Sequence, residues 1–130
     1  MVNGMHIAVL MGGPGSERHV SLRSAEGVAA ALIKGGATVT SVDVTGPDFE
    51  VPVGVDIVFN CIHGTFGEDG ALQQLLERRG IRYTGARATS SERAFDKVIS
   101  KKLFIENDVP TPPFEAISLS RGQKPTMAVP

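Results

Sequence analysis

The feature that most constrains the fold is a short apolar run that ends abruptly in glycines. Residues 7–11 have the length and continuous apolar character of a strand that is covered on both faces. Gly12, Gly13 and Gly15 follow, and glycines permit backbone angles and close approaches that a side chain would block. Ser16 is then placed to cap a helix. A strand that ends in glycines at the start of a helix gathers free backbone N–H groups, which suit an anion or a polar small molecule.

The helix after this turn carries an apolar face. Its inner residues recur at i, i+3, i+4 and i+7, at Ala25, Val28, Ala29 and Leu32. Gly35 and Gly36 end the helix, and residues 37–44 alternate as a second strand.

A second strand–turn–helix unit follows a loop at residues 45–54. A third strand is predicted at 55–62, and it runs into another glycine turn at 64–70. The next helix should bury Leu72, Leu75 and Leu76, with the acids Glu68 and Asp69 in its first turn. Gly80 ends this helix, and a short strand is predicted at 81–84.

The last third of the chain is predicted to be mostly helical. Residues 89–92, Thr-Ser-Ser-Glu, fit a capping box, and the helical pattern continues to Asn107 with a break into two helices near Asp96. Prolines end the pattern, and 114–119 should form a last strand.

This alternation predicts an α/β fold with an open, mainly parallel, twisted sheet and helices on both faces. Ligands of such sheets bind beyond the carboxyl ends of the strands. Both glycine turns follow strands, so we expect them to form one site at the same edge. We assign residues 1–119 to this domain, and residues 120–130 to the start of a linker to an absent central domain.

Composition excludes several classes of protein. The 130 residues suffice for one domain with its own core. Thirteen basic side chains balance fourteen acidic ones, which argues against a broad nucleic-acid surface. No apolar run approaches the roughly 20 residues that span a bilayer, and a signal-peptide pattern is missing. Cys61 is the single cysteine, so an internal disulfide is excluded and the cytoplasm is the default location.

The first turn only partly fits a dinucleotide-binding fingerprint. Arg18 stands where the third glycine, needed for close packing of helix on strand, would be. Asp43, at the end of the second strand, remains a candidate ribose contact. No Walker-type phosphate loop is present.

The polar residues near the turns each have a simpler interpretation. Glu17 is well placed to interact with the helix dipole, and His63 to bond with the backbone. Cys61 fits a small buried apolar group. Lys97 fits a solvated helix face. The histidines and the cysteine lack metal-ligand spacing, so we expect no metal to be bound by this chain alone.

Two motifs carry a family resemblance. Residues 10–21, Leu-Met-Gly-Gly-Pro-Gly-Ser-Glu-Arg-His-Val-Ser, and residues 63–70, His-Gly-Thr-Phe-Gly-Glu-Asp-Gly, resemble the signature of the D-alanine–D-alanine ligases. His19 stands where the family usually has an acid, and Pro14-Gly15 replaces a commoner pair of small polar residues. Neither change affects Glu17. Further matches lie in the same order over nearly the whole chain, at 72–77, 83–85, 95–97 with Lys101, and 109–112.

The resemblance implies an enzyme of the ATP-grasp type with three domains, of which this chain resembles the first. The family activates the carboxylate of one D-alanine with ATP as an acyl phosphate. The amine of a second D-alanine attacks it, and the dipeptide serves peptidoglycan synthesis, cell-wall biogenesis and cell shape. Magnesium (or manganese) holds the nucleotide phosphates, and ATP and metal are bound mainly by domains absent here.

The resemblance also implies roles for individual residues. Glu17 would hold the ammonium group of the first D-alanine, and His63 would orient its carboxylate, which makes both catalytic candidates. Val20 and Ser21 would border the amino-acid site, and Lys97 would reach the nucleotide phosphates.

Other functions stay open at this point. The family resemblance also fits a ligase that joins D-lactate or D-serine as acceptor, and the chain alone fits a non-catalytic binding module. As an N-terminal piece it is expected to bind no ATP tightly and to make no dipeptide. The resemblance further implies a homodimer, whereas the expectations of a cytoplasmic location and of no nucleic-acid or membrane partner rest on composition.

Overall fold

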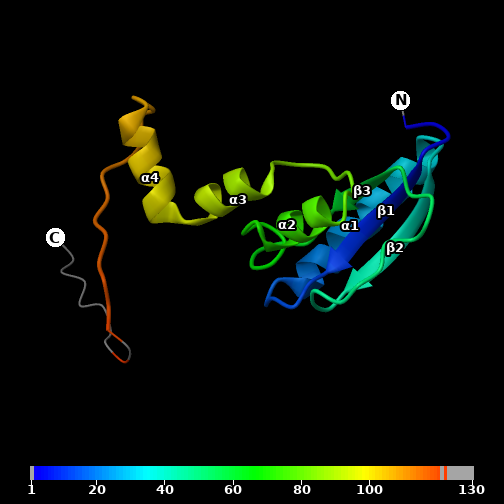
Figure 1. The fold of residues 1–130 in the computed structure, drawn as a ribbon, viewed down its shortest axis with the longest axis horizontal. Helices are drawn as coiled ribbons and strands as arrows, with labels where there is room; N and C mark the ends of the chain where they lie inside the picture. Colours follow the sequence, from blue (N-terminus) through cyan, green and yellow to red (C-terminus); the bar gives the residue numbers. More distant parts are fainter. Residues whose placement is uncertain (1, 121, 123–130) are drawn as a thin grey trace.

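The computed structural model describes residues 2–120 and 122. The elements, in chain order, are β1 (His6–Gly12), α1 (Arg18–Lys34), β2 (Thr38–Val44), β3 (Ile57–Asn60), α2 (Ala71–Arg78), α3 (Ala88–Phe95) and α4 (Lys97–Glu106). The strands form a parallel sheet in the order β2-β1-β3, so the first strand lies in the centre (Figure 1).

The register of β1 sends alternate residues to opposite faces of the sheet. Leu10 pairs with Val42 on one side and with Asn60 on the other. Leu10 packs in the cluster that includes α2, whereas Val9 packs with Ala25 of α1. One helix therefore covers each face, and the predicted open parallel α/β fold is confirmed.

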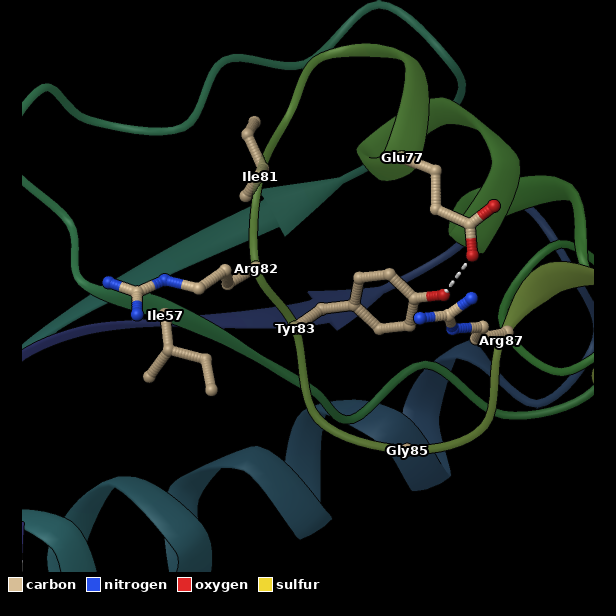
Figure 2. A pocket seen from close by; sticks show the side chains of 7 residues that line it. All are labelled: Ile57, Glu77, Ile81, Arg82, Tyr83, Gly85 and Arg87. Carbon is tan, nitrogen blue, oxygen red and sulfur yellow. Dashed lines mark hydrogen bonds between the residues drawn. The ribbon is translucent and has the colours of Figure 1, made fainter.

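The third strand is shorter than predicted, and the segment after α2 is barely a strand. β3 ends at Asn60 because its side chain accepts from the Ile62 N–H and donates to the Gly67 carbonyl, which turns the chain. Within 81–84, Tyr83 alone forms a bridge, to Val58. Figure 2 shows this segment beside β3.

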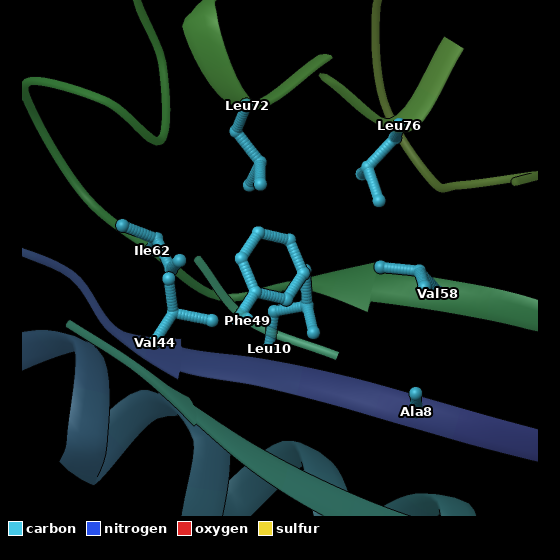
Figure 3. Packing of buried hydrophobic residues seen from close by; sticks show 8 residues of the cluster. All are labelled: Ala8, Leu10, Val44, Phe49, Val58, Ile62, Leu72 and Leu76. Carbon is cyan, nitrogen blue, oxygen red and sulfur yellow. The ribbon is translucent and has the colours of Figure 1, made fainter. Parts of the chain in front are cut away.

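The face under α2 holds the larger core. Leu72 and Leu76 point down from α2 onto the sheet, and Phe49, from the loop after β2, fills the space between them and β1 (Figure 3). Both leucines are fully buried, and each such burial contributes about 1.5–3 kcal/mol. The cluster comprises Ala8, Leu10, Val44, Phe49, Val58, Ile62, Leu72 and Leu76.

Of the four residues predicted for the inner face of α1, Ala25, Val28 and Leu32 pack against the sheet, whereas Ala29 is not part of that cluster. The predicted cap is wrong, because α1 begins at Arg18 with Glu17 as its cap residue. The turn closes through the backbone instead, with the Arg18 N–H donating to the Gly15 carbonyl at 3.3 Å. Ser16 therefore lies one residue outside the cap.

The acids at the second turn are not in the first turn of α2, which begins at Ala71. Glu68 lies in the turn itself. Asp69 accepts from the Phe66 and Ala71 N–H groups and so shapes the entry to the helix.

The predicted capping box is also wrong, because α3 begins at Ala88 and residue 89 is already helical. The carboxylate of Glu77 accepts the Ala88 N–H instead. The predicted break into two helices is confirmed, since Asp96 separates α3 from α4 and caps α4 by accepting from the Val98 and Ile99 N–H groups.

The last strand predicted at 114–119 does not form. α3 and α4 lead away from the sheet, and the segment after α4 runs back along that helix, far from any strand edge (Figure 1). Lys101 holds this segment by donating to the Pro112 carbonyl and by lying over the Phe114 ring. The linker predicted at 120–130 lies, apart from residues 120 and 122, outside the described residues.

No helix within residues 2–120 is both long and apolar enough to cross a membrane.

Candidate functional site

The two glycine turns lie together at the carboxyl edge of the sheet, because β1 and β3 run parallel. A Cβ on Gly13 would collide with the Ile62 side chain, and one on Gly15 would lie 3.6 Å from the Thr65 carbonyl oxygen. The expectation that both turns meet at one edge is confirmed. Glycine is required at position 13, because the Ile62 side chain occupies the space of a Cβ there, whereas a Cβ at position 15 would make an ordinary contact with the second turn.

Ser21 connects the end of β1 to the residue that follows β3. Its fully buried hydroxyl accepts the Gly12 N–H at 2.9 Å and donates to the Cys61 carbonyl at 2.6 Å. This hydroxyl is thereby committed to the scaffold, and Ser21 shapes the site from beneath. Val20, its neighbour on α1, is half-buried.

Glu17 lies against the second turn. The residue is exposed, and its carboxylate makes no cap hydrogen bond to α1, in contrast to a simple capping role. The carboxylate contacts Gly64 so closely that a Cβ there would collide with Oε1. Gly64 also has φ of 66°, a conformation that favours glycine. Glu17 is therefore brought beside the residue that follows His63.

The imidazole of His63 is held between α1 and the second turn. Its Nε2 lies 3.1 Å from the Ser24 hydroxyl, and its Nδ1 lies 3.5 Å from the Glu68 carboxylate. Sequence reasoning missed Ser24 and treated Glu68 only as a helix-terminal acid. The periodicity contained the signal, because Glu17, Ser21 and Ser24 stand at i, i+4 and i+7 on one helix face.

Arg18 and Asp43 form a bidentate ion pair next to these residues. The guanidinium donates to the two carboxylate oxygens at 2.8 and 2.6 Å. This hydrogen bonding raises the pKa of Arg18 and lowers the pKa of Asp43. Since Arg18 takes both carboxylate oxygens, Asp43 does not stand free as the ribose contact considered for a dinucleotide.

Lys97 is not brought to this edge. It is exposed at the start of α4, which packs among the described elements on α3 alone, and α4 lies far from the strand ends (Figure 1).

Neither a metal centre nor a reactive thiol is built into the described part of the chain. Within residues 2–120, no three His, Cys, Asp or Glu side chains are grouped to hold an ion. Cys61 is buried, and burial raises the pKa of its thiol. It is the packed apolar group that the sequence suggested.

A separate cavity of about 530 Å³ lies along β3 and the 81–84 segment (Figure 2). It is lined by Ile57, Glu77, Ile81, Arg82, Tyr83, Gly85 and Arg87, none of which belongs to the glycine turns. In it, the Tyr83 hydroxyl donates to Glu77 at 2.6 Å, and the same carboxylate holds the start of α3. This contact joins α2 to α3. We therefore place the candidate site at the turns, where the Glu17 carboxylate, which makes no cap hydrogen bond, lies beside the turn that follows His63.

The chain is similar to known ligases in both sequence and fold. Residues 45–86 match the family model described as D-ala D-ala ligase N-terminus. The D-alanine–D-alanine ligase of Methylacidiphilum infernorum is 58% identical over 109 residues, which are 84% of this chain and 36% of that protein. The corresponding ligase of Rickettsia bellii is 48% identical over 120 residues, 90% of this chain and 36% of that protein.

Solved structures of ligases are similar to this chain in fold. The D-alanine–D-alanine ligase of Aeromonas hydrophila has a TM-score of 0.77 at 34% identity, covering 87% of this chain and 50% of that chain. The Bacillus anthracis ligase complexed with ATP has a TM-score of 0.73 at 32% identity, covering 85% of this chain and 39% of that one. The chain spans about a third of the length of the curated relatives it matches.

Proposed function

We propose that this chain, which belongs to the D-alanine–D-alanine ligase family as the counterpart of the ligase N-terminus, forms the first-substrate site of an ATP-dependent ligase. The observation that supports this proposal best is the meeting of Glu17 and the His63 turn, which are far apart in the chain and adjacent at the sheet edge. The product would be D-alanyl-D-alanine for peptidoglycan synthesis.

Glu17 is suited to bind the ammonium group of D-alanine. Its carboxylate is exposed at the start of α1 and free of cap bonding, so it can pair with a cation without breaking a bond of the scaffold. Its position at the start of α1 also places it near the positive end of the helix dipole.

His63 is suited to orient the substrate carboxylate. Ser24 and Glu68 flank its two ring nitrogens and fix the plane of the imidazole. To accept a hydrogen bond from this ring, the substrate carboxylate would replace Ser24 or Glu68 at one of the two nitrogens. The fixed position of the ring then matters when the carboxylate oxygen attacks phosphorus and the acyl phosphate forms.

ATP, with Mg²⁺ or Mn²⁺, would supply the phosphoryl group that activates the first D-alanine. The described residues fit this cofactor set poorly, since they offer no three-ligand metal group and hold Lys97 away from the turns. We therefore assign nucleotide and metal to the remaining two thirds of the ligase, with Lys97 as this chain's candidate phosphate contact. Homodimerisation stays a prediction from the resemblance, and a cytoplasmic location stays a prediction from composition.

The test is Glu17→Gln in the complete ligase that carries these residues. Loss of the charge should raise the KM for the first D-alanine by about 10- to 100-fold and lower kcat, since a charged hydrogen bond to substrate contributes roughly 1.5–3 kcal/mol. His63→Ala should lower kcat, as measured by ATP-dependent dipeptide formation.

Glu26→Gln, an exposed glutamate on the same helix, is the matched control and should change neither constant. Unchanged kinetics in Glu17→Gln would refute the proposed role and leave Glu17 as a helix-terminal charge.

A further inference from the structure

The Arg18–Asp43 pair spans from the first residue of α1 to the end of β2. Arg18 Nη1 and Nη2 donate to the two Asp43 oxygens at 2.8 and 2.6 Å, and Nη1 also lies 3.4 Å from the Val44 carbonyl oxygen. The guanidinium therefore connects the start of the helix both to a side chain and to the backbone of the neighbouring strand. Bidentate pairing fixes orientation as well as distance.

The first glycine turn is shaped around this pair. A Cβ on Gly12 would collide with the Arg18 guanidinium and the Asp43 carboxylate. Beneath it, the Gly13 N–H donates to the Val44 carbonyl at 2.6 Å, and both glycines have φ near 90°, at 86° and 89°. The turn, the helix start and the β2 end thus form one connected unit.

Global stability does not account for this arrangement. The two side chains remain 38% and 45% exposed, and exposed ion pairs contribute only about 0–1 kcal/mol. What the pair does fix is the direction in which α1 leaves the sheet, and Glu17 immediately precedes Arg18. Since the Glu17 carboxylate has no cap bond of its own, its place against Gly64 depends on how that helix start is held.

We propose that Arg18 and Asp43 are positioning residues, a clamp that holds Glu17 against Gly64 so that the ammonium group of an α-amino acid is bound in one orientation. This inference rests on the proposed function of Glu17 and extends it to two residues that touch no substrate. The lowered pKa of Asp43, caused by hydrogen bonding from Arg18, keeps its carboxylate ionised to a lower pH than that of a free aspartate.

The clamp is tested by a double-mutant cycle in the complete ligase, with Arg18→Lys, Asp43→Asn and the double variant. Lysine keeps the charge of Arg18 but cannot form the bidentate contact. Each single variant should raise the KM for the first D-alanine about 5- to 50-fold with the KM for ATP unchanged, because displacement of Glu17 weakens one substrate only. The double variant should be no worse than either single one.

Arg23→Lys, an exposed arginine on the same helix, is the matched control and should leave both constants unchanged. Asp43→Glu, which keeps the carboxylate, should recover part of the lost D-alanine affinity. A fall in melting temperature without a change in the KM for D-alanine would overturn the clamp and leave the pair a structural one. Equal effects on D-alanine and ATP, or additive single effects, would overturn it too.

The Glu17→Gln variant separates the clamp hypothesis from the proposed function of Glu17. If Glu17→Gln raises the KM for D-alanine and Arg18→Lys does not, the clamp is wrong and the proposed function stands. If Glu17→Gln changes nothing, the proposed function itself fails.

Discussion

The sheet with α1 and α2 differs from the α3–α4 region in what covers its apolar residues. In the first region, Leu10, Leu72 and Leu76 are fully buried between sheet and helix. In the second, α4 has no buried residue, and its Phe104 and Ile105 remain 42% and 59% exposed. Both regions nevertheless have the apolar periodicity of helices.

This contrast shows what periodicity does and does not predict. The spacing of Phe95, Ile99 and Leu103 correctly predicts helix, but it implies a covering surface that the described residues do not supply. In the first region the covering surface is the sheet, which also fixes how each helix is oriented. The candidate site lies in that region, where burial on both faces of β1 holds the strand ends in place.

The largest expected effect compares the same substitution in the two regions. Leu72→Ala should lower the free energy of unfolding by about 2–5 kcal/mol, whereas Leu103→Ala on α4 should lower it by less than about 1 kcal/mol. Urea unfolding followed by circular dichroism measures both. Equal losses would show that α4 is covered in solution and would remove the contrast.

A smaller effect is expected at the junction of α3 and α4. Asp96→Ala removes the cap that accepts two N–H groups at 2.9 and 3.0 Å, and loss of such a cap costs about 0.5–2 kcal/mol. Hydrogen exchange should accelerate in α4 and stay unchanged in β1, because α4 packs within the described elements only on α3. Asp96→Asn, which can still cap, is the control. Accelerated exchange in both elements would mean that the two regions unfold together.

The smallest effect concerns Tyr83, where the two regions are joined. Burial, followed by its hydrogen bond to Glu77, raises the pKa of Tyr83 to about 12 from the ordinary value of 10.0. A raised pKa means that the neutral phenol stabilises the fold below pH 10, and this contribution is lost as the pH rises toward 12. The chain has one tyrosine and no tryptophan, so phenolate absorbance during alkaline titration reports on this side chain alone. A titration midpoint of Tyr83 at the ordinary value would show that the Tyr83–Glu77 contact between the two regions is open in solution.

The candidate site could be predicted only in part. The glycine turns after parallel strands predicted that Glu17 and His63 lie at one edge of the sheet, whereas the roles given to these two residues came from the family resemblance. Ser24 and Glu68 were missed as imidazole partners, and the pairing of Asp43 with Arg18 was missed as well. The Ser24–His63 and Arg18–Asp43 contacts join residues far apart in the chain, so local spacing shows which residues share a helix face but not which partner they meet.

The sequence by itself determined the order of strands and helices, the parallel sheet and the two glycine turns. These depend on short-range properties, namely apolar periodicity, the backbone freedom of glycine and the fixed backbone angle of proline. Only the tertiary structure decided where helices begin, which predicted strands pair, and which partner each polar side chain takes. Ser16 and residues 114–119 show the reason, since a cap or a strand forms only where the packed chain leaves a donor or an edge within reach.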